Sequence, residues 1–282
     1  MATAKQPTIM ARGLGGELRL LRKGRKLSCQ AVAAQLGWQA SKLSRMETGK
    51  QGIRPADVAS LLVVYGVTGR DRDRLIKLAE RSDDTGYWEN QSALSAESKT
   101  LMRIEREATD IVIFEPLVIP GLVQTGDYVR AMMRVCNVAD QDIDSRVAAR
   151  LARQAILTKD EPPNLKLIVD EFVLHRVLAS PKSMARQLRH ILEVVEQGAT
   201  TLQVLPLSLR GHSGLDGSYT LLDFTSNKPV VYLDHKVSGL FLEEDAHIEF
   251  FRAETDSLGE LALSPAKSAE LVATIAREHD RE

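Results

Sequence analysis

The chain has 282 residues, of which 44% are hydrophobic and 27% charged, as in a globular protein with one large domain or two smaller ones. The sequence contains no apolar run near the roughly 20 residues that a membrane helix needs. It also contains no secretory signal pattern, and its two cysteines, Cys29 and Cys136, form no CxxC pair. We therefore expect a cytoplasmic protein without a membrane segment, a disulfide framework or a zinc site.

The charge is divided unevenly along the chain. Residues 1–80 contain 15 Lys and Arg against 6 Asp and Glu, a net charge of +9, whereas residues 81–282 contain 22 against 32, a net charge of −10. A basic segment followed by an acidic remainder indicates a nucleic-acid partner for the N-terminal part. The alternative is a chance imbalance on a solvated surface, and the pattern of the first 80 residues argues against it.

The first 80 residues predict five short helices. Apolar spacing places them over residues 16–26, 29–36, 40–48, from 55 onward, and 71–81. Ser28 suits the N-cap of the second helix, and Gly37 ends that helix because glycine adopts a positive φ easily. Two short helices joined by such a tight glycine turn are a helix-turn-helix signature. We expect a flexible segment over residues 1–11, a helix-turn-helix domain over 12–81, and a linker over 82–98 in which Tyr87 and Trp88 dock on a neighbouring part.

Several positions in this segment match one family at the same time. The segment resembles the XRE family, the Cro/cI-type repressor DNA-binding domain, at Leu27-Ser28, Ala33, Leu36-Gly37, Leu43-Ser44, Glu47 and Gly49-Lys50. The resemblance implies that the helix from Ala40 is the recognition helix, with its N-terminal end toward base edges in the major groove. The matching base-reading positions are Gln39, Ala40, Ser41, Lys42, Ser44 and Arg45.

Two of these positions have a specific chemistry for reading bases. Arg45 is the best candidate for a specific contact, because a guanidinium binds guanine O6 and N7 together, and Ala40 suits a thymine methyl group. Lys42 and Ser44 suit either a base or a phosphate. Gln39 stands where the family often has Ser or Thr, so the helix cap is weaker and the side chain is freer to reach DNA.

Other basic and amide side chains are candidates for phosphate contacts, which fix the register on DNA but carry no sequence information. These are Lys23, Arg25, Gln30, Lys50, Gln51 and Arg54. In the family a glutamine often begins the second helix, but here Cys29 takes that position and Gln30 follows. This departure puts in doubt the contact that the family's glutamine makes with the DNA backbone.

Three further residues of this segment have two interpretations each. Arg22 and Glu47 match a pair that links the first and third helices in such repressors, and we interpret them as a structural salt bridge rather than a DNA contact. Trp38 fits either the core or a stack on a base, with the core preferred. Cys29 has a redox-sensor alternative, but no resolving cysteine is near it in the sequence.

Residues 99–282 change pattern and predict a mixed α/β (α+β) domain, large enough to bury its own core. Strands are expected over residues 111–114, 165–169, 202–207, 219–224, 230–233 and 240–242. Helices are expected over 99–108, 127–135, 144–157, 172–178, 184–197, 246–257 and 265–279. With the N-terminal all-α five-helix domain, the expected fold is a helix-turn-helix domain followed by an α+β domain.

This second part is similar to the domain of unknown function that follows an XRE domain in actinomycete regulators of the WhiJ type. The shared segments are residues 119–125, Arg150-Leu151-Ala152-Arg153-Gln154, 170–174, Gln187-Leu188, Val204-Leu205-Pro206 and 217–224. Such regulators are often encoded beside a small acidic protein and are described as toxin–antitoxin-like. The resemblance therefore implies a small acidic partner protein.

Patterns for catalysis are incomplete. The segment from Gly211 to Leu215 is half of a nucleophile elbow without its last glycine, and we interpret it as a glycine-rich hairpin loop. Asp170 and Glu171 are more typical of a helix start than of an acid–base pair. Asp234 and His235 are neighbours on a strand and point to opposite faces. Since the sequence also has no phosphate-binding or metal-ligand motif, we expect no enzyme activity, cofactor or metal.

These observations favour a cytoplasmic, nucleoid-associated transcription regulator that binds an inverted repeat in double-stranded DNA as a homodimer. Its C-terminal domain would dimerise, or sense a protein or small-molecule partner. The alternative is an antitoxin-like interaction protein that binds a small neighbouring-gene product and regulates its own promoter. A third hypothesis, an enzyme that acts on a small molecule, needs a surface pocket with several buried titratable groups.

Overall fold

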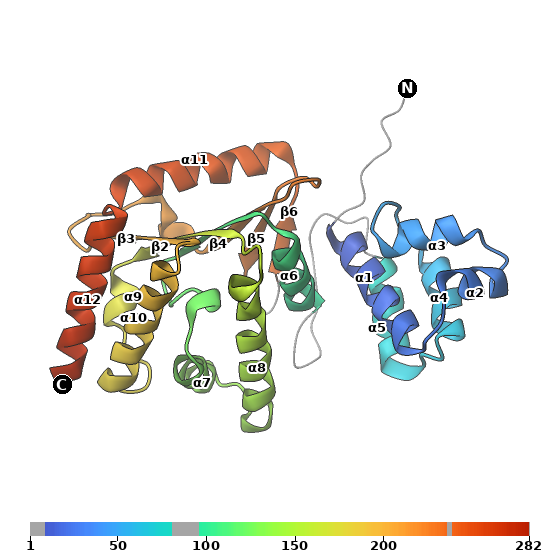
Figure 1. Ribbon diagram of the computed structural model, residues 1–282, viewed down its shortest axis with the longest axis horizontal. Helices are drawn as coiled ribbons and strands as arrows, with labels where there is room; N and C mark the ends of the chain where they lie inside the picture. Colours follow the sequence, from blue (N-terminus) through green and yellow to red (C-terminus); the bar gives the residue numbers. More distant parts are fainter. Residues whose placement is uncertain (1–8, 81–95, 236–238, 282) are drawn as a thin grey trace. The chain divides into compact units, whose positions relative to one another are not determined.

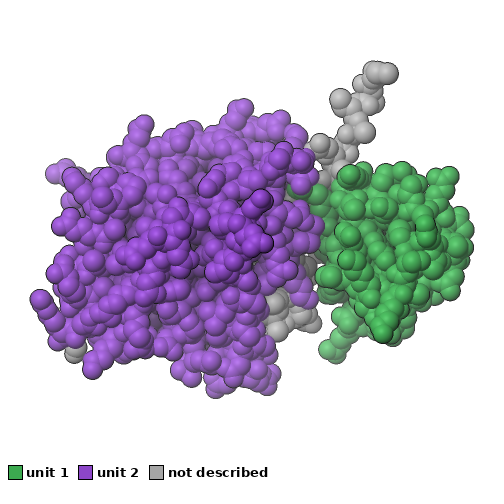
Figure 2. All heavy atoms as spheres, viewed as in Figure 1, with its two compact units in different colours: residues 1–87 green, residues 88–282 purple. Residues whose placement is uncertain are grey.

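The computed structural model describes residues 9–80, 96–235 and 239–281. The chain divides into two compact units, residues 1–87 and residues 88–282 (Figure 2). The expected linker over residues 82–98, with Tyr87 and Trp88, lies almost entirely outside the described residues. The second unit already begins a helix at Ala96, three residues before the expected start.

The first unit is the expected bundle of five helices (Figure 1). They are α1 (Ile9–Gly24), α2 (Cys29–Gln35), α3 (Ala40–Glu47), α4 (Pro55–Val64) and α5 (Gly69–Glu80). Their apolar faces meet in a core whose members are less than 2% exposed, among them Leu14, Leu18, Val32, Leu43, Met46, Val58, Leu61, Leu62, Tyr65 and Leu75.

Helix α1 begins seven residues earlier than expected. Ala11, Leu14 and Leu18 are all buried, and their spacing of three and four residues continues the apolar stripe of a helix toward the N-terminus. The expectation of a flexible segment over residues 1–11 is therefore wrong for residues 9–11, which are helical. Residues 1–8 lie outside the described part of the chain.

The second unit contains a six-stranded mixed sheet in the order β3-β2-β1-β4-β5-β6. Its strands are β1 (Asp110–Glu115), β2 (Asn164–Asp170), β3 (Thr200–Leu205), β4 (Tyr219–Asp223), β5 (Val230–Asp234) and β6 (Gly239–Leu242). Strands β1, β2 and β3 are parallel to one another, and the remaining pairs are antiparallel. This sheet and the helices around it confirm the expected α+β class.

The helices of this unit cover both faces of the sheet. They are α6 (Ala96–Glu107), α7 (Gly126–Val135), α8 (Asp140–Arg153), α9 (Phe172–His175), α10 (Pro181–Glu196), α11 (Asp245–Leu261) and α12 (Pro265–Arg281). Figure 1 shows α11 on one side of the sheet and α7, α8 and α10 on the other. Helix α11 contributes Ile248 and Leu258 to a core cluster with Phe114, Tyr219, Leu221 and Val231 of the sheet.

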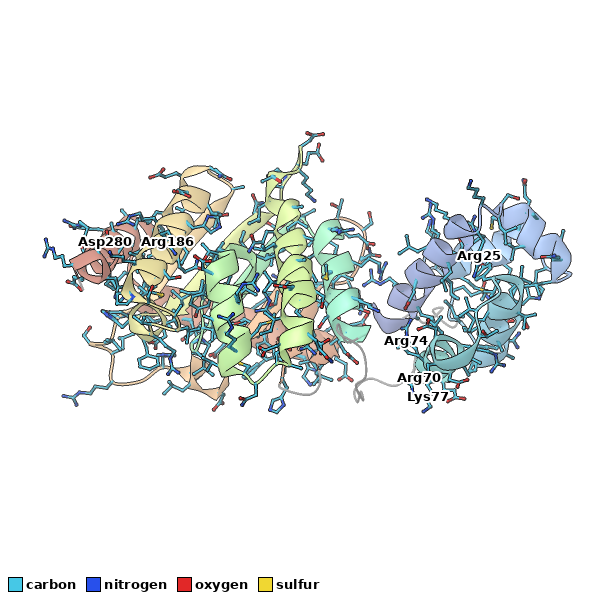
Figure 3. All side chains as sticks on the ribbon, turned by 90° about the horizontal axis from the view of Figure 1, so that it is seen from below. Arg25, Arg70, Arg74, Lys77, Arg186 and Asp280 are labelled. Atoms are coloured by element: carbon cyan, nitrogen blue, oxygen red, sulfur yellow. The ribbon has the colours of Figure 1, made fainter. Side chains whose placement is uncertain are left out.

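Helices α10 and α12 pack against each other beside β3. Arg189 of α10 forms an ion pair with Asp280 of α12. Figure 3 shows Arg186 and Asp280 on these two helices. Arg186 also pairs with Asp127 at the start of α7, at 2.7 Å, so charged contacts at the surface tie three helices of this unit together.

Short 3-10 helices account for the main local differences from expectation. The basic helix expected over residues 144–157 is α8, which ends at Arg153 and continues as a 3-10 helix over Gln154–Thr158. The expected hairpin loop around Gly211 contains a 3-10 helix, Ser213–Asp216, that ends at Gly217. Within the described residues, no helix is long and apolar enough to cross a membrane.

Candidate nucleic-acid interface

The turn between α2 and α3 is fixed by capping at both ends of α2. The Ser28 hydroxyl accepts a hydrogen bond from the Ala31 backbone N–H at 3.0 Å, which caps the N-terminus. At the C-terminus Gly37 adopts φ +66°, and the Trp38 N–H donates to the Ala33 carbonyl at 2.8 Å. This is the six-to-one bond of a Schellman motif, and it sends the chain directly into α3.

Helix α1 approaches the end of α3 so closely that only glycine fits between them. A Cβ atom at Gly15 would stand 2.2 Å from the Met46 carbonyl oxygen. Glycine is required at position 15 because of Met46, a residue 31 positions away, so no local sequence pattern marks Gly15. The close approach fixes the position of α3 relative to α1.

A buried bidentate ion pair joins the same two helices. Arg22 Nε and Nη2 donate to the two carboxylate oxygens of Glu47, each at 2.7 Å, and Arg22 Nη1 donates to the Leu27 carbonyl, also at 2.7 Å. The hydrogen bonds that Arg22 donates to Glu47 raise the pKa of the Arg22 guanidinium despite its burial. The contact agrees with the predicted structural salt bridge between the first and third helices.

The predicted base-reading residues share the outer face of α3. Gln39, Ser41, Ser44 and Arg45 are exposed, whereas Ala40 and Lys42 are half-buried. Gln39 is the N-cap residue, and its side chain makes no capping hydrogen bond. Its amide therefore remains available at the N-terminal end of the helix, which is the end that enters the major groove in this class.

Lys42 is engaged within the domain. Its ammonium group lies 2.8 Å from Asp57 Oδ1 and 3.8 Å from the centre of the Trp38 ring. Asp57, near the start of α4, also accepts a hydrogen bond from Arg54 Nε at 3.0 Å. Trp38, whose ring the Lys42 ammonium covers, is half-buried, so it belongs neither fully to the core nor fully to the surface.

The pKa of the Asp57 carboxyl reflects these two cations. Burial alone would raise the pKa, but the hydrogen bonds from Arg54 and Lys42 outweigh it and lower the pKa below its usual value. Asp57 was not among the predicted site residues. Lys42 and Arg54 both donate hydrogen bonds to the Asp57 carboxylate. Each must therefore give up its hydrogen bond to Asp57 before its side chain can reach DNA.

Arg45 has a second neighbour from the predicted set. Its Nε donates to Gln51 Oε1 at 3.3 Å, a contact between exposed groups that DNA can replace. The chain returns toward Arg45 because Gly49 adopts φ +65° and the Lys50 N–H donates to the Arg45 carbonyl at 2.8 Å. The structure therefore brings Arg45 and Gln51 together, with the exposed Lys50 between them in the chain.

The remaining phosphate candidates are more scattered. Lys23, Arg25 and Gln30 are exposed. An Arg25 nitrogen lies 3.8 Å from the place where a Cβ would stand on Gly66, just beyond the C-terminal end of α4. Arg54 is the N-cap at the other end of this helix of 10 residues, about 15 Å away. Arg25 therefore lies at the opposite end of α4 from Arg54.

Helix α5 adds basic residues that sequence analysis did not assign to the interface. Arg70, Arg74 and Lys77 follow the spacing of one helix face, and Figure 3 shows them along this helix. Arg74 is paired with Glu17 of α1, which makes it a packing residue. The i, i+4, i+7 spacing of these three residues is visible in the sequence. It does not by itself indicate a DNA contact, because charged helix faces are common on ordinary protein surfaces.

Cys29 lies half-buried at the start of α2. Its thiol donates to the Ala40 carbonyl at 3.6 Å, and burial raises the pKa of the thiol. The thiolate is the form that reacts with oxidants, so this environment disfavours the redox-sensor alternative. The contact instead links the first residues of α2 and α3.

In the second unit, Asp170 and Glu171 follow β2. Asp170 Oδ1 accepts a hydrogen bond from the Phe172 N–H at 2.8 Å, which agrees with a helix-start role. Asp170 Oδ2 also lies 3.1 Å from His212 Nε2, a contact between residues 42 positions apart that the sequence did not indicate. Among the described residues, no cluster of three or more potential metal ligands is found.

Comparisons with known families assign both units. A family model described as a helix-turn-helix domain matches residues 13–75. A second, described as a domain of unknown function (DUF5753), matches residues 98–274, more than half of the chain. The chain belongs to the DUF5753 family. With its helix-turn-helix domain, this DUF5753 protein is a DNA-binding regulator. No curated protein and no solved structure matches it.

Proposed function

We propose that this protein is a sequence-specific transcription regulator of the XRE (Cro/cI) type, acting on DNA in the cytoplasm and nucleoid. The observation that carries the proposal is the outer face of α3. It presents the polar side chains of Gln39, Ser41, Ser44 and Arg45 to solvent. The Arg22–Glu47 pair and the close approach at Gly15 hold the inner side of that helix in place.

In this proposal the N-terminal end of α3 enters the major groove. Arg45 exchanges its contact with Gln51 for O6 and N7 of a guanine, and Ala40 meets a thymine methyl group. Lys50 and Arg54 contact phosphates on either side, which makes the affinity fall steeply with salt. Two copies of the chain place their recognition helices about 34 Å apart on an inverted repeat.

The DUF5753 unit then supplies the dimer contact, or the site for a protein or small-molecule partner, that changes promoter occupancy. The proposal includes no catalytic step. The net negative charge of residues 81–282 disfavours contact of the second unit with DNA, because the phosphate backbone repels acidic surfaces. DNA binding is accordingly assigned to the first unit alone.

The experiment that tests this function is selection of genomic DNA fragments by the purified full chain, read by sequencing. We expect enrichment of an inverted repeat with half-sites about one helical turn apart. An Arg45→Ala variant is expected to lose this enrichment and still bind DNA weakly. If no genomic sequence is enriched over the unselected background, sequence-specific regulation is contradicted.

The acidic charge of residues 81–282 favours a second candidate. Residues 81–282, with 32 acidic and 22 basic side chains, are numerous enough to serve chiefly as a binding module, as in an antitoxin-like protein whose DNA contact is autoregulatory. A pull-down with the full chain tests it. Stoichiometric recovery of one small neighbouring-gene product supports this candidate, and recovery of no such protein counts against it.

A further inference from the structure

A cavity of about 220 Å³ lies within the DUF5753 unit, between its sheet and three helices. Strands β1, β4 and β5 form one wall. Leu101 of α6, Met132 of α7 and Arg150 of α8 contribute to the other. A cavity of this volume has room for several waters or for one molecule of amino-acid size.

The strand register explains why polar groups converge here. Ile113, Thr220 and Tyr232 are paired across β1, β4 and β5, so their side chains lie on one face of the sheet. Side chains two positions farther along a strand point the same way, which brings Glu115 and Asp234 to this face. All five residues line the cavity.

Two carboxylates form the acidic end of the cavity. Glu115 and Asp234 end β1 and β5, on either side of β4. Asp234 accepts a hydrogen bond from the Tyr232 hydroxyl at 3.2 Å, whereas no hydrogen bond reaches the Glu115 carboxyl from any described residue. Burial and the charge of Asp234 raise the pKa of Glu115 to about 8. A cation placed between these two carboxylates would relieve both effects.

Two arginines of α8 also line the cavity, near enough to Glu115 to oppose the rise in its pKa, and their surroundings differ. Arg153 is bound by both carboxylate oxygens of Glu105, each at 2.5 Å. Arg150 donates to Gln124 Oε1 at 3.0 Å and to Met132 Sδ at 3.8 Å, and it forms no ion pair with a carboxylate of the described chain. Burial lowers the pKa of the Arg150 guanidinium, as expected for a cation that lacks a partner.

We propose that this cavity binds a small zwitterion of the amino-acid class. Its ammonium group lies between Glu115 and Asp234, and its carboxylate is bound by the free side of the Arg150 guanidinium. The hydroxyls of Ser218, Thr220 and Tyr232 line the intervening wall, and Leu101 and Ile113 provide apolar contact for a side chain. Both charged ends of the ligand thereby meet groups of opposite sign in a partly desolvated site.

The binding site itself depends only on the geometry of the second unit. Its role as the effector site of a regulator rests on the function proposed above. Amino-acid binding is therefore measured in the absence of DNA. If no amino acid binds, the binding-site proposal fails and the DNA-selection result still stands. If the selection fails, the proposed function fails and a measured affinity for an amino acid still stands.

The test is isothermal titration calorimetry of the full chain with each of the standard L-amino acids. We expect at least one to bind with a dissociation constant below about 1 mM. For that amino acid, the matching amine without a carboxylate and the matching carboxylate without an amine are titrated as well. Each is expected to bind at least about tenfold more weakly, because it leaves one charged end of the cavity unpaired.

Substitutions assign the two ends of the ligand. Glu115→Gln and Arg150→Gln are each expected to weaken binding by about ten- to a hundredfold. The exposed residues Glu260 and Arg134 give matched controls, since Glu260→Gln and Arg134→Gln make the same chemical changes away from the cavity. Glu115→Gln keeps the shape of the side chain and breaks no hydrogen bond within the described chain, so a loss of binding in this variant is not a loss of fold.

Three results would overturn the proposal. The first is the absence of saturable binding by any amino acid. The second is equal affinity for an amino acid and for its amine or carboxylate fragment, which would show that only one end of the cavity is used. The third is equal weakening by the cavity variants and by their surface controls.

Discussion

A bidentate arginine–glutamate pair joins two helices in each unit, but the surroundings of Arg22–Glu47 and Arg153–Glu105 differ. In the helix-turn-helix unit, Arg22 and Glu47 join α1 to α3 at 2.7 Å, and the helix that holds Glu47 presents its other face to solvent. In the DUF5753 unit, Arg153 and Glu105 join α8 to α6 at 2.5 Å beside a cavity. One pair supports an exposed surface, and the other supports an internal site.

The difference shows how an arginine's partner decides its role. Arg153 and Arg150 stand three positions apart on α8 and both line the cavity, yet among the described residues a carboxylate pairs with Arg153 and not with Arg150. Arg22 and Arg45 form a similar contrast in the first unit, where the Arg45 side chain donates to the Gln51 amide and forms no ion pair with any described carboxylate. In each unit one arginine is paired with a carboxylate, and a second arginine forms no such pair within the described residues.

The largest expected effect comes from breaking the two buried pairs. Glu47→Ala and Glu105→Ala each leave a buried guanidinium without its carboxylate, which destabilises the corresponding unit by about 3–5 kcal/mol. Thermal unfolding followed by circular dichroism measures the change. Glu80→Ala, at an exposed site on α5, is the control and should leave the unfolding temperature unchanged. An unchanged unfolding temperature for Glu47→Ala would show that the Arg22–Glu47 contact is not structural.

A smaller effect is expected at the contact between α1 and α3. Gly15→Ala introduces a Cβ 2.2 Å from the Met46 carbonyl oxygen, so the two helices must separate, at about 1–3 kcal/mol of unfolding free energy. Gly24→Ala is the matched control on the same helix, because a Cβ there meets no atom within 4 Å. Urea unfolding compares the two variants. Equal stabilities would mean that α3 does not depend on this close approach.

Arg45 is expected to act on binding rather than on stability. Arg45→Ala should weaken the specific site by about 1–3 kcal/mol and relax the preference at one base pair. Lys50→Ala should instead weaken all sequences alike, since a phosphate contact reads no base. Fluorescence anisotropy with the selected site and with single-base variants separates the two patterns. Identical profiles for the two variants would place the reading face elsewhere on α3.

Much of the first unit was predictable because its determinants are close together in the sequence. Ser28, Gly37 and Gly49 mark helix ends by local rules of capping and positive φ. The structure begins α2 and α3 at the predicted residues and also places the Arg22–Glu47 pair. What the sequence missed depends on distant contacts. Gly15 is needed because of Met46, and Lys42 is held by Asp57.

The second unit shows the same limit more strongly. Its strands and helices were predicted in the correct order, because apolar alternation and helical spacing are local signals. The cavity was not predicted, since its charged lining comes from β1, β5 and α8, and only the strand register brings Glu115 and Asp234 to one face. Asp234 was weighed only together with its sequence neighbour His235, which lies just beyond the end of β5.

The smallest expected effect concerns the carboxylate shared by Lys42 and Arg54. Asp57→Asn removes a negative charge beside the recognition helix and frees both cations for phosphates. Affinity for any DNA should therefore rise by less than about tenfold, and the slope of log affinity against log salt should steepen by about one. Anisotropy with a random duplex over a range of salt concentrations measures both quantities. Asp71→Asn, at an exposed position on α5, controls for the change in net charge.

The same substitution should cost at most about 1 kcal/mol of stability, since Arg54 is largely exposed and solvent screens its pair. The pKa of Asp57 is lowered in the folded state, so its stabilising contribution is present above the unfolded pKa of about 3.9 and is lost as the pH falls through the folded value. Urea unfolding of the wild type and Asp57→Asn should therefore differ at pH 7 and converge in acid. A difference that persists at low pH would mean that Asp57 acts through packing rather than through its charge.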